Sequence, residues 1–222
     1  MIYQIQILTV LYNLKMQLPP ELQSYTEDAY LLHIPAGVNC IVSADKVLQE
    51  QQELSYDTKA KMYGRVVNKH ARYNISQEPD YDSGKGRVVM FDQVKYLCKL
   101  RNTWLQIIGP KAAKLLAEGN YYYDITKTGI GYHGDAERRK VIAARFGNSM
   151  PLHYQWFYQS NPIGTRGVLG LNHGDIYIMS EKAVGTDWKK RSHLTLRHAA
   201  GASKYVKKPF TRPFLVNVNR YL

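Results

Sequence analysis

Cysteine and acidic residues are scarce in this chain of 222 residues. Its two cysteines, Cys40 and Cys98, lie far apart and belong to no metal-binding or redox motif, which excludes a disulfide-built scaffold and indicates a reducing compartment. Asp and Glu number 18 against 30 Lys and Arg, so the formal net charge is +12. Such an excess attracts polyanions, meaning nucleic acid or an acidic surface, and a merely basic enzyme is the alternative interpretation.

Long hydrophobic runs are also missing. The first residues, MIYQIQILTVLYNL, are apolar but include Gln and Asn and have no basic region before them. We therefore expect a strand or a buried segment there, not a signal peptide. No later run is long enough to span a membrane. The expectation is an intracellular monomer, in the cytoplasm or the nucleus, with no membrane partner.

The remaining composition is that of an ordinary globular domain. Hydrophobic residues make up 45% of the chain and charged residues 22%, and the length predicts one domain with a sizeable core. Tyrosine is abundant, at 18 residues. Exposed aromatic rings beside Lys and Arg can stack on bases, although most tyrosines are expected in sheet or core positions.

Local patterns predict three helices and many short strands. A helix is expected over 44–54 with Ser43 as its N-cap, a second over 91–108, and a third over 111–118 after Gly109-Pro110. Strands are expected at 30–35, 141–147, 151–158, 176–179, within 192–201 and at 212–218. Short strands separated by Gly, Asn and Pro over 120–222 indicate an antiparallel β architecture.

A basic and aromatic segment precedes the second helix. Residues 59–73, KAKMYGRVVNKHARY, contain six Lys, Arg or His and two tyrosines. This mixture suits a surface that binds phosphates and stacks on bases, and a solvated hairpin with basic side chains is the alternative. The candidate substrate-binding residues are Lys61, Tyr63, Arg65, Lys69, Arg72 and Tyr73.

A possible metal site lies in Thr126–Arg145, TKTGIGYHGDAERRKVIAAR. His133 and Asp135 are two residues apart, so on an extended strand their side chains point to the same face. Two such ligands and one further histidine form the facial triad that holds non-haem Fe(II) while leaving coordination positions open. The later candidates for the third ligand are His153, His173, His193 and His198.

Several motifs together resemble a known enzyme family. GIGYHGDAE, the later HGDIYIM, Trp188 and the run SHLTLRHAAG are similar to the AlkB-like branch of the 2-oxoglutarate/Fe(II)-dependent dioxygenases, over about residue 120 to the C-terminus. The resemblance implies a mainly β fold with flanking helices, built on a double-stranded β-helix (jelly-roll) core. It also implies a single catalytic domain, with an N-terminal extension and substrate lid over about 1–90, including a mobile loop at 79–86, and the core over 91–222.

The resemblance implies roles for single residues as well. His133, Asp135 and His198 would hold Fe(II), Asn120 and Tyr122 would contact 2-oxoglutarate, and Arg212 would bind its carboxylate. A competing alignment matches Arg191 and Arg197 to two arginines of the family. It would require an iron-binding histidine between Asp175 and Lys190, where the sequence has none, so we favour His198.

The implied activity is hydroxylation or oxidative demethylation of a base in DNA or RNA, with O2 as co-substrate. Two alternatives stay open: an oxygenase that acts on a protein side chain or a small molecule, and a non-catalytic nucleic-acid-binding module on the same fold. The basic composition favours the nucleic-acid substrate.

Overall fold

The computed structural model describes residues 8–54, 57–62, 65–75 and 88–207. Its strands are β1 (Val10–Asn13), β2 (Tyr30–Ile34), β3 (Asp57–Met62), β4 (Arg65–Ile75), β5 (Val88–Val89), β6 (Ala117–Tyr121), β7 (Gly129–His133), β8 (Val141–Ala144), β9 (Leu152–Tyr158), β10 (Asn161–Leu169), β11 (Ile176–Met179) and β12 (Thr195–Gly201). Its α-helices are α1 (Pro20–Gln23), α2 (Ala44–Gln52), α3 (Lys95–Ile108), α4 (Glu181–Val184) and α5 (Ser203–Val206).

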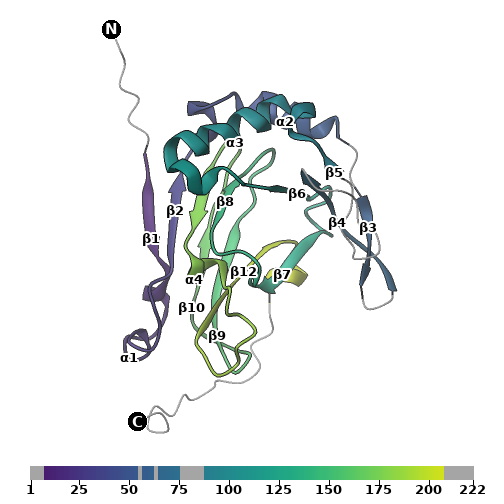
Figure 1. The fold of residues 1–222 in the computed structure, drawn as a ribbon. Helices are drawn as coiled ribbons and strands as arrows, with labels where there is room; N and C mark the ends of the chain where they lie inside the picture. Colours follow the sequence, from purple (N-terminus) through teal and green to yellow (C-terminus); the bar gives the residue numbers. More distant parts are fainter. Residues whose placement is uncertain (1–7, 55–56, 63–64, 76–87, 208–222) are drawn as a thin grey trace.

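Most of these strands form two antiparallel sheets. The first sheet is four-stranded, in the order β1-β2-β11-β8, and the second is four-stranded, in the order β10-β9-β12-β7. A third sheet has the order β3-β4-β5, with β6 paired to β4, and its β3 and β4 lie at the right of Figure 1. Only the short β4–β5 pairing is parallel among the described strand pairs. The protein is therefore mainly antiparallel β with a few helices, as the sequence predicted.

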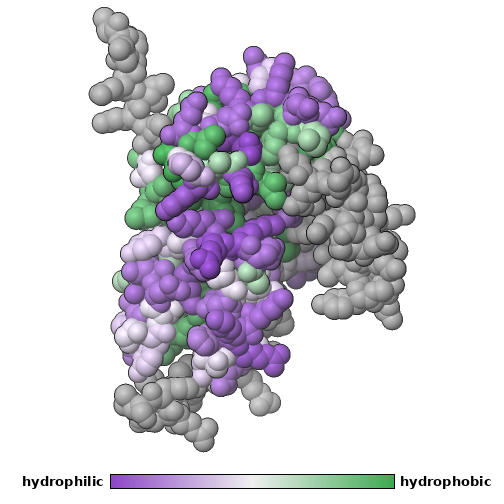
Figure 2. All heavy atoms as spheres, viewed as in Figure 1, coloured by the Kyte–Doolittle hydropathy of each residue, from purple (hydrophilic) through white to green (hydrophobic). Residues whose placement is uncertain are grey.

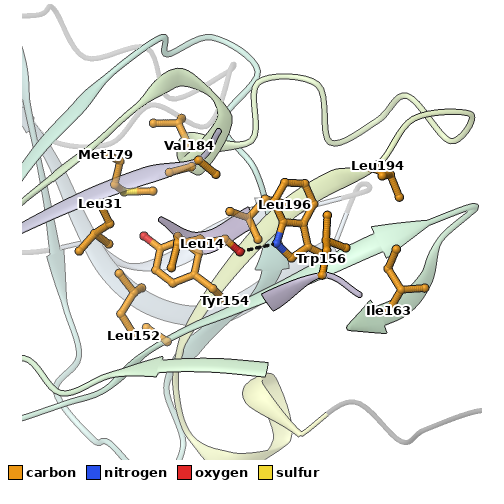
Figure 3. Close-up of a cluster of buried hydrophobic side chains, with 14 of the residues drawn as sticks. Leu14, Leu31, Leu152, Tyr154, Trp156, Ile163, Met179, Val184, Leu194 and Leu196 are labelled. Carbon is orange, nitrogen blue, oxygen red and sulfur yellow. Dashed lines mark hydrogen bonds between the residues drawn. The ribbon is translucent and has the colours of Figure 1, made fainter. Parts of the chain in front are cut away.

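The main core lies between the first and second sheets. Alternate residues of β9, namely Leu152, Tyr154 and Trp156, are buried there and meet Leu31 and Met179 of the first sheet. The indole Nε1 of Trp156 donates a hydrogen bond of 2.8 Å to the carbonyl oxygen of Leu14 (Figure 3). This bond satisfies the buried indole N–H, as a tryptophan inside a core requires.

Helices α2 and α3 cover the other face of the first sheet, at the top of Figure 1. Val47 of α2 and Trp104 of α3 pack in one cluster with Ile176 of β11. Hydrophilic residues cover the outward sides of these helices, and hydrophobic residues show beneath them (Figure 2). Among the described residues, no helix combines the length and the apolar character needed to cross a bilayer.

The predicted helices are confirmed in two cases and wrong in one. Ser43 caps α2 by accepting from the backbone N–H of Lys46, and the helix ends at Gln52. The predicted helix 91–108 is a 3-10 turn at Phe91–Gln93 followed by α3. Instead of a helix over 111–118, the chain forms a 3-10 turn at Gly109–Ala112 and then β6. Pairing of β6 with β4 outweighs the local helix propensity of this segment.

The first sheet contains strands from both sides of residue 90, where the sequence analysis placed the boundary between the N-terminal extension and the core. Strands β1 and β2, which precede that point, pair into the first sheet beside β11. The described core therefore draws on both parts of the chain. Other predicted strands are confirmed at β2, β9, β11 and β12, while β8 is half-buried and shorter than the predicted buried strand 141–147.

The core predicts the effect of a truncation in β12. Leu196 is fully buried between the sheets, so Leu196→Ala should lower the free energy of unfolding by about 2–5 kcal/mol, because the smaller side chain buries less apolar surface and leaves a cavity. Urea unfolding followed by circular dichroism measures this change. Val168→Thr, at a position on β10 that is 60% exposed, should change it by less than about 0.5 kcal/mol. Equal effects of the two substitutions would contradict this core assignment.

Candidate metal centre

Two neighbouring strands bring three metal-ligand side chains together. Strand β12 pairs with β7 so that His198 lies opposite His133. Asp135 follows β7 by two residues. The Nε2 atom of His133 lies 3.8 Å from Oδ1 of Asp135, and the Nε2 atom of His198 lies 3.9 Å from Oδ2. One ligand atom from each of the three residues lies within 4.8 Å of the others. The structure thus assembles the predicted triad.

The spacing and the chemistry of these side chains fit a divalent metal ion. Metal bonds to histidine nitrogen and carboxylate oxygen are about 2 Å long, which requires donor atoms roughly 3 to 4 Å apart. The separations of 3.8 Å and 3.9 Å meet that requirement. Two imidazoles and one carboxylate are also the ligand set of non-haem Fe(II) sites, although they suit other divalent ions too. The group can therefore hold a metal ion.

Hydrogen bonding and burial hold the histidines in a state that can bind a metal. Nδ1 of His133 lies 2.7 Å from the carbonyl oxygen of Gly131, so Nδ1 donates a hydrogen bond to this carbonyl and Nε2 is the ring nitrogen nearest Asp135. Burial, followed by the charges of His133 and Arg138, lowers the pKa of His198 to about 3. His198 is thus neutral near pH 7, as a metal ligand must be.

The glycine between the two ligands of the HGD motif is required by packing. A Cβ atom on Gly134 would overlap the carbonyl oxygen of Gly185 and would lie 2.9 Å from Cβ of Trp188. The backbone N–H of Asp135 donates to the carbonyl oxygen of Val184, at 3.1 Å. The end of α4 and the following turn therefore hold the metal-site loop against the second sheet.

An arginine that the sequence analysis missed supports the carboxylate ligand. Nη1 of Arg138 lies 3.4 Å from Oδ2 of Asp135, and its Nη2 pairs with Glu118 of β6. Burial raises the pKa of the Asp135 carboxyl, and the positive charges of Arg138 and His133 oppose that rise. A bound cation would act in the same direction as these two charges. The only sequence signal for Arg138 was its place three residues after Asp135.

The two residues predicted to contact 2-oxoglutarate lie at the end of β6 and directly after it, and Asn120 is exposed. Asn120 is two residues from Glu118 on β6, so the two side chains share a face. Tyr122 follows the strand and packs against the main core. Its ring centre lies 6.0 Å from the Cζ atom of Arg145.

The predicted basic segment forms a hairpin beside the metal centre. Lys61 lies on β3 and Arg65, Lys69, Arg72 and Tyr73 lie on β4, while Tyr63 and the loop 76–87, with the predicted mobile loop, fall outside the described residues. Strand β4 pairs with β6 so that Arg72 lies opposite Asn120. This register places the hairpin beside the strand that carries Glu118. Arg212 also lies outside the described residues.

The other histidines lie outside the triad. His33 pairs with Asp175 at 3.0 Å, and Nδ1 of His173 accepts from the backbone N–H of Gly147, so both have structural roles. His153 lies on the opposite face of β9 from Tyr154. His193 is exposed. Among the described residues, the triad draws on none of these four side chains.

The arginines of the competing alignment point away from the triad. Arg191 is exposed. Arg197 adjoins His198 on β12, so its side chain leaves the opposite face of the sheet. Its Cζ atom lies 4.3 Å from the ring centre of Phe157 and 5.4 Å from that of Trp188. This placement favours the alignment in which His198 is the ligand.

Removal of any one ligand should abolish metal binding. Each of the variants His133→Ala, Asp135→Ala and His198→Ala retains only two of the three protein ligands. Two ligands do not hold the metal ion in the facial arrangement that leaves its other coordination positions open. Titration calorimetry with Mn(II) measures the change in affinity. The control variants His173→Ala and His193→Ala should bind Mn(II) as the parent protein does. Loss of binding in His193→Ala with retention in His198→Ala would contradict the assignment.

Comparison with other proteins gives one clear relationship. No family model matches the chain. Over 184 residues the sequence is 51% identical to "Uncharacterized protein R156" of Acanthamoeba polyphaga mimivirus, an alignment that covers 81% of this chain and 72% of the viral protein. Identity at this level over most of both chains implies common descent and a shared fold. The chain belongs to the same family as this mimivirus protein.

Proposed function

We propose that this protein is an AlkB-like dioxygenase that uses Fe(II) and 2-oxoglutarate to oxidise a base in nucleic acid. The observation that carries the proposal is the triad of His133, Asp135 and His198, whose ligand atoms lie within 4.8 Å of one another. Two histidines and one carboxylate occupy one side of a metal ion and leave the other side for a co-substrate and O2. The net charge of +12 supports a polyanionic substrate.

The strand order supports a double-stranded β-helix. The chain leaves the second sheet after β7 and enters the first sheet at β8. It returns to the second sheet for the β9–β10 hairpin, crosses to the first again at β11, and re-enters the second at β12. Such repeated crossing between two facing sheets is typical of jelly-roll folds. The predicted strand 212–218 lies outside the described residues.

Each residue of the centre has a role in this proposal. His133, Asp135 and His198 would bind the iron, Arg138 would orient the Asp135 carboxylate, and Asn120 and Tyr122 would contact 2-oxoglutarate. When bound, the iron would supply activation of O2, coupled to the decarboxylation of 2-oxoglutarate to succinate. The hydrogen bond from His133 to Gly131 keeps its imidazole in one tautomer and orientation.

The basic hairpin supports a nucleic-acid substrate. Strands β3 and β4 carry Lys61, Arg65, Lys69 and Arg72. Strand β4 pairs with β6, whose Glu118 pairs with Arg138 of the metal centre. Phosphate contacts from such side chains would position the backbone, and a base in a duplex would have to be flipped out to reach the metal. Hydroxylation of an N-methyl group would then lead to demethylation, and hydroxylation of a C-methyl group would stop at the alcohol.

Anaerobic spectroscopy tests the oxygenase proposal. Addition of Fe(II) and then 2-oxoglutarate to the parent protein should produce a weak visible charge-transfer band, because the 2-oxo acid chelates the iron. His198→Ala should give no band, and His173→Ala should give the parent's spectrum. A parent protein that binds Fe(II) but gives no band with 2-oxoglutarate would contradict the proposal.

Salt-dependent binding tests the substrate class. Replacement of Lys61, Arg65, Lys69 and Arg72 by Gln should weaken oligonucleotide binding and reduce the slope of log K against log salt by about one unit for each phosphate that the variant no longer neutralises. Fluorescence anisotropy at several salt concentrations measures both quantities. The matched control replaces four exposed lysines on α3 and in the segment that follows it, Lys95, Lys99, Lys111 and Lys114. No oligonucleotide binding by the parent would favour a protein or small-molecule substrate.

A further inference from the structure

The last part of the chain carries basic residues and no acidic ones. After Asp187 the sequence contains no Asp or Glu. The basic turn, Trp188–Arg191, lies between α4 and β12, and its Lys189, Lys190 and Arg191 are all exposed. None of the ion pairs among the described residues includes these three side chains. Three cations thus lie together on the surface without a counterion from the described part of the chain.

Hydrogen bonds fix the backbone of the basic turn. The N–H of Lys190 donates to the carbonyl oxygen of Asp187, and the carbonyl oxygen of Arg191 accepts from the turn between β9 and β10. At the base of the basic turn, the buried ammonium of Lys182 lies 2.7 Å from Oδ2 of Asp187 and donates to the carbonyl oxygen of Leu194. Asp187 is therefore engaged by Lys182 and does not neutralise the exposed cations.

An arginine of β12 holds the indole of Trp188 in place. The Cζ atom of Arg197 lies 5.4 Å from the ring centre of Trp188 and 4.3 Å from that of Phe157. Its Nη2 atom donates to the carbonyl oxygen of Trp188. The Nζ atom of Lys189 lies 5.6 Å from the same indole, and cations at such distances are attracted to an aromatic ring. Trp188 is half-buried, so part of this fixed ring is open to solvent.

The cations of this surface repel one another. Arg197 is 8% exposed, and burial together with the charge of Arg191 lowers the pKa of its guanidinium. Its Nε atom is buried and has no hydrogen-bond partner among the described residues. A partly desolvated cation beside a second cation is unfavourable unless an anion approaches the two. The surface is therefore suited to an anionic ligand.

The basic turn also packs against the metal-site loop. The Cβ atom of Trp188 lies 2.9 Å from the position that a Cβ atom on Gly134 would take, and Gly134 stands between the ligands His133 and Asp135. A polyanion bound to the basic turn would therefore lie beside the metal centre. The basic hairpin of β3 and β4 reaches the same centre separately, through β6 and Arg138. The metal centre thus adjoins two basic segments.

We propose that Lys189, Lys190 and Arg191, with the indole of Trp188, form a second nucleic-acid contact surface that binds the single strand next to the oxidised base. This inference rests on the proposed function and deepens it. The three cations would neutralise phosphates, and the indole, held by Arg197, would stack on a base, as aromatic side chains do in single-strand binding sites. An acidic peptide would also be attracted by the cations, but it offers no nucleobase to the indole.

Tryptophan fluorescence reports on this surface. The chain has three tryptophans, of which Trp104 and Trp156 are buried and Trp188 is half-buried. A single-stranded oligothymidylate should therefore quench the emission of the parent protein as it binds, because a base stacked on an indole quenches its fluorescence. Trp188→Phe should still bind Mn(II) and the oligonucleotide, since phenylalanine can stack as well, but binding should no longer quench the remaining emission.

Removal of the three charges tests the phosphate contacts. Replacement of Lys189, Lys190 and Arg191 by Gln should reduce the slope of log K against log salt by about two units, since each contact with a single strand contributes about 0.7. Fluorescence anisotropy at several salt concentrations measures the slope, and an unchanged affinity for Mn(II) shows that the variant is folded. The matched control, which should keep the parent's slope and quenching, replaces three exposed lysines by Gln, namely Lys95, Lys99 and Lys111.

The contrary results separate this inference from the proposed function. The parent's slope in the triple variant, or quenching that persists in Trp188→Phe, would overturn the role of the basic turn, and weaker binding by the hairpin variant would still support a nucleic-acid substrate. If the triple variant loses binding to polyglutamate but not to the oligonucleotide, the basic turn binds an acidic protein instead, which also overturns the inference. A parent that binds no oligonucleotide would refute the nucleic-acid substrate and this inference together.

Discussion

The metal centre depends on the position of β12 inside the second sheet. This strand pairs with β7 on one side and with β9 on the other, so His198 lies between His133 and Tyr154. Its alternate residues, such as Leu196, are buried in the main core, and burial on one face fixes the register. A shift by one residue would turn His198 to the outer face and bring Arg197 inward. The same packing that stabilises the sheet therefore assembles the ligands.

Close contacts from outside the second sheet fix the remaining ligand. Gly134 leaves no room for a side chain beside Gly185, and Asp135 is held through its backbone by Val184 and through its carboxylate by Arg138. The pairing of Arg138 with Glu118 connects this carboxylate to β6 and, through it, to the basic hairpin. The surface that we propose for nucleic acid and the metal centre thus share one network of contacts.

The core beside the triad contains a polar group. Tyr154 is buried, its ring centre lies 6.1 Å from that of His198, and its hydroxyl has no hydrogen-bond partner among the described residues. Buried hydroxyls normally have partners, so Tyr154 places a polar atom among the mainly apolar side chains of this core.

The sequence by itself determined the local features: the cap at Ser43, the strands β9, β11 and β12, and the pairing of His133 with Asp135 through their spacing of two residues. These depend on neighbours in the chain. Tertiary structure decided the rest. It made β6 from a segment with helix propensity, brought His198, which the resemblance had favoured, beside His133, and paired Arg138 with Glu118. These outcomes depend on which strands pair, and that is set by burial between distant segments, which no local pattern specifies.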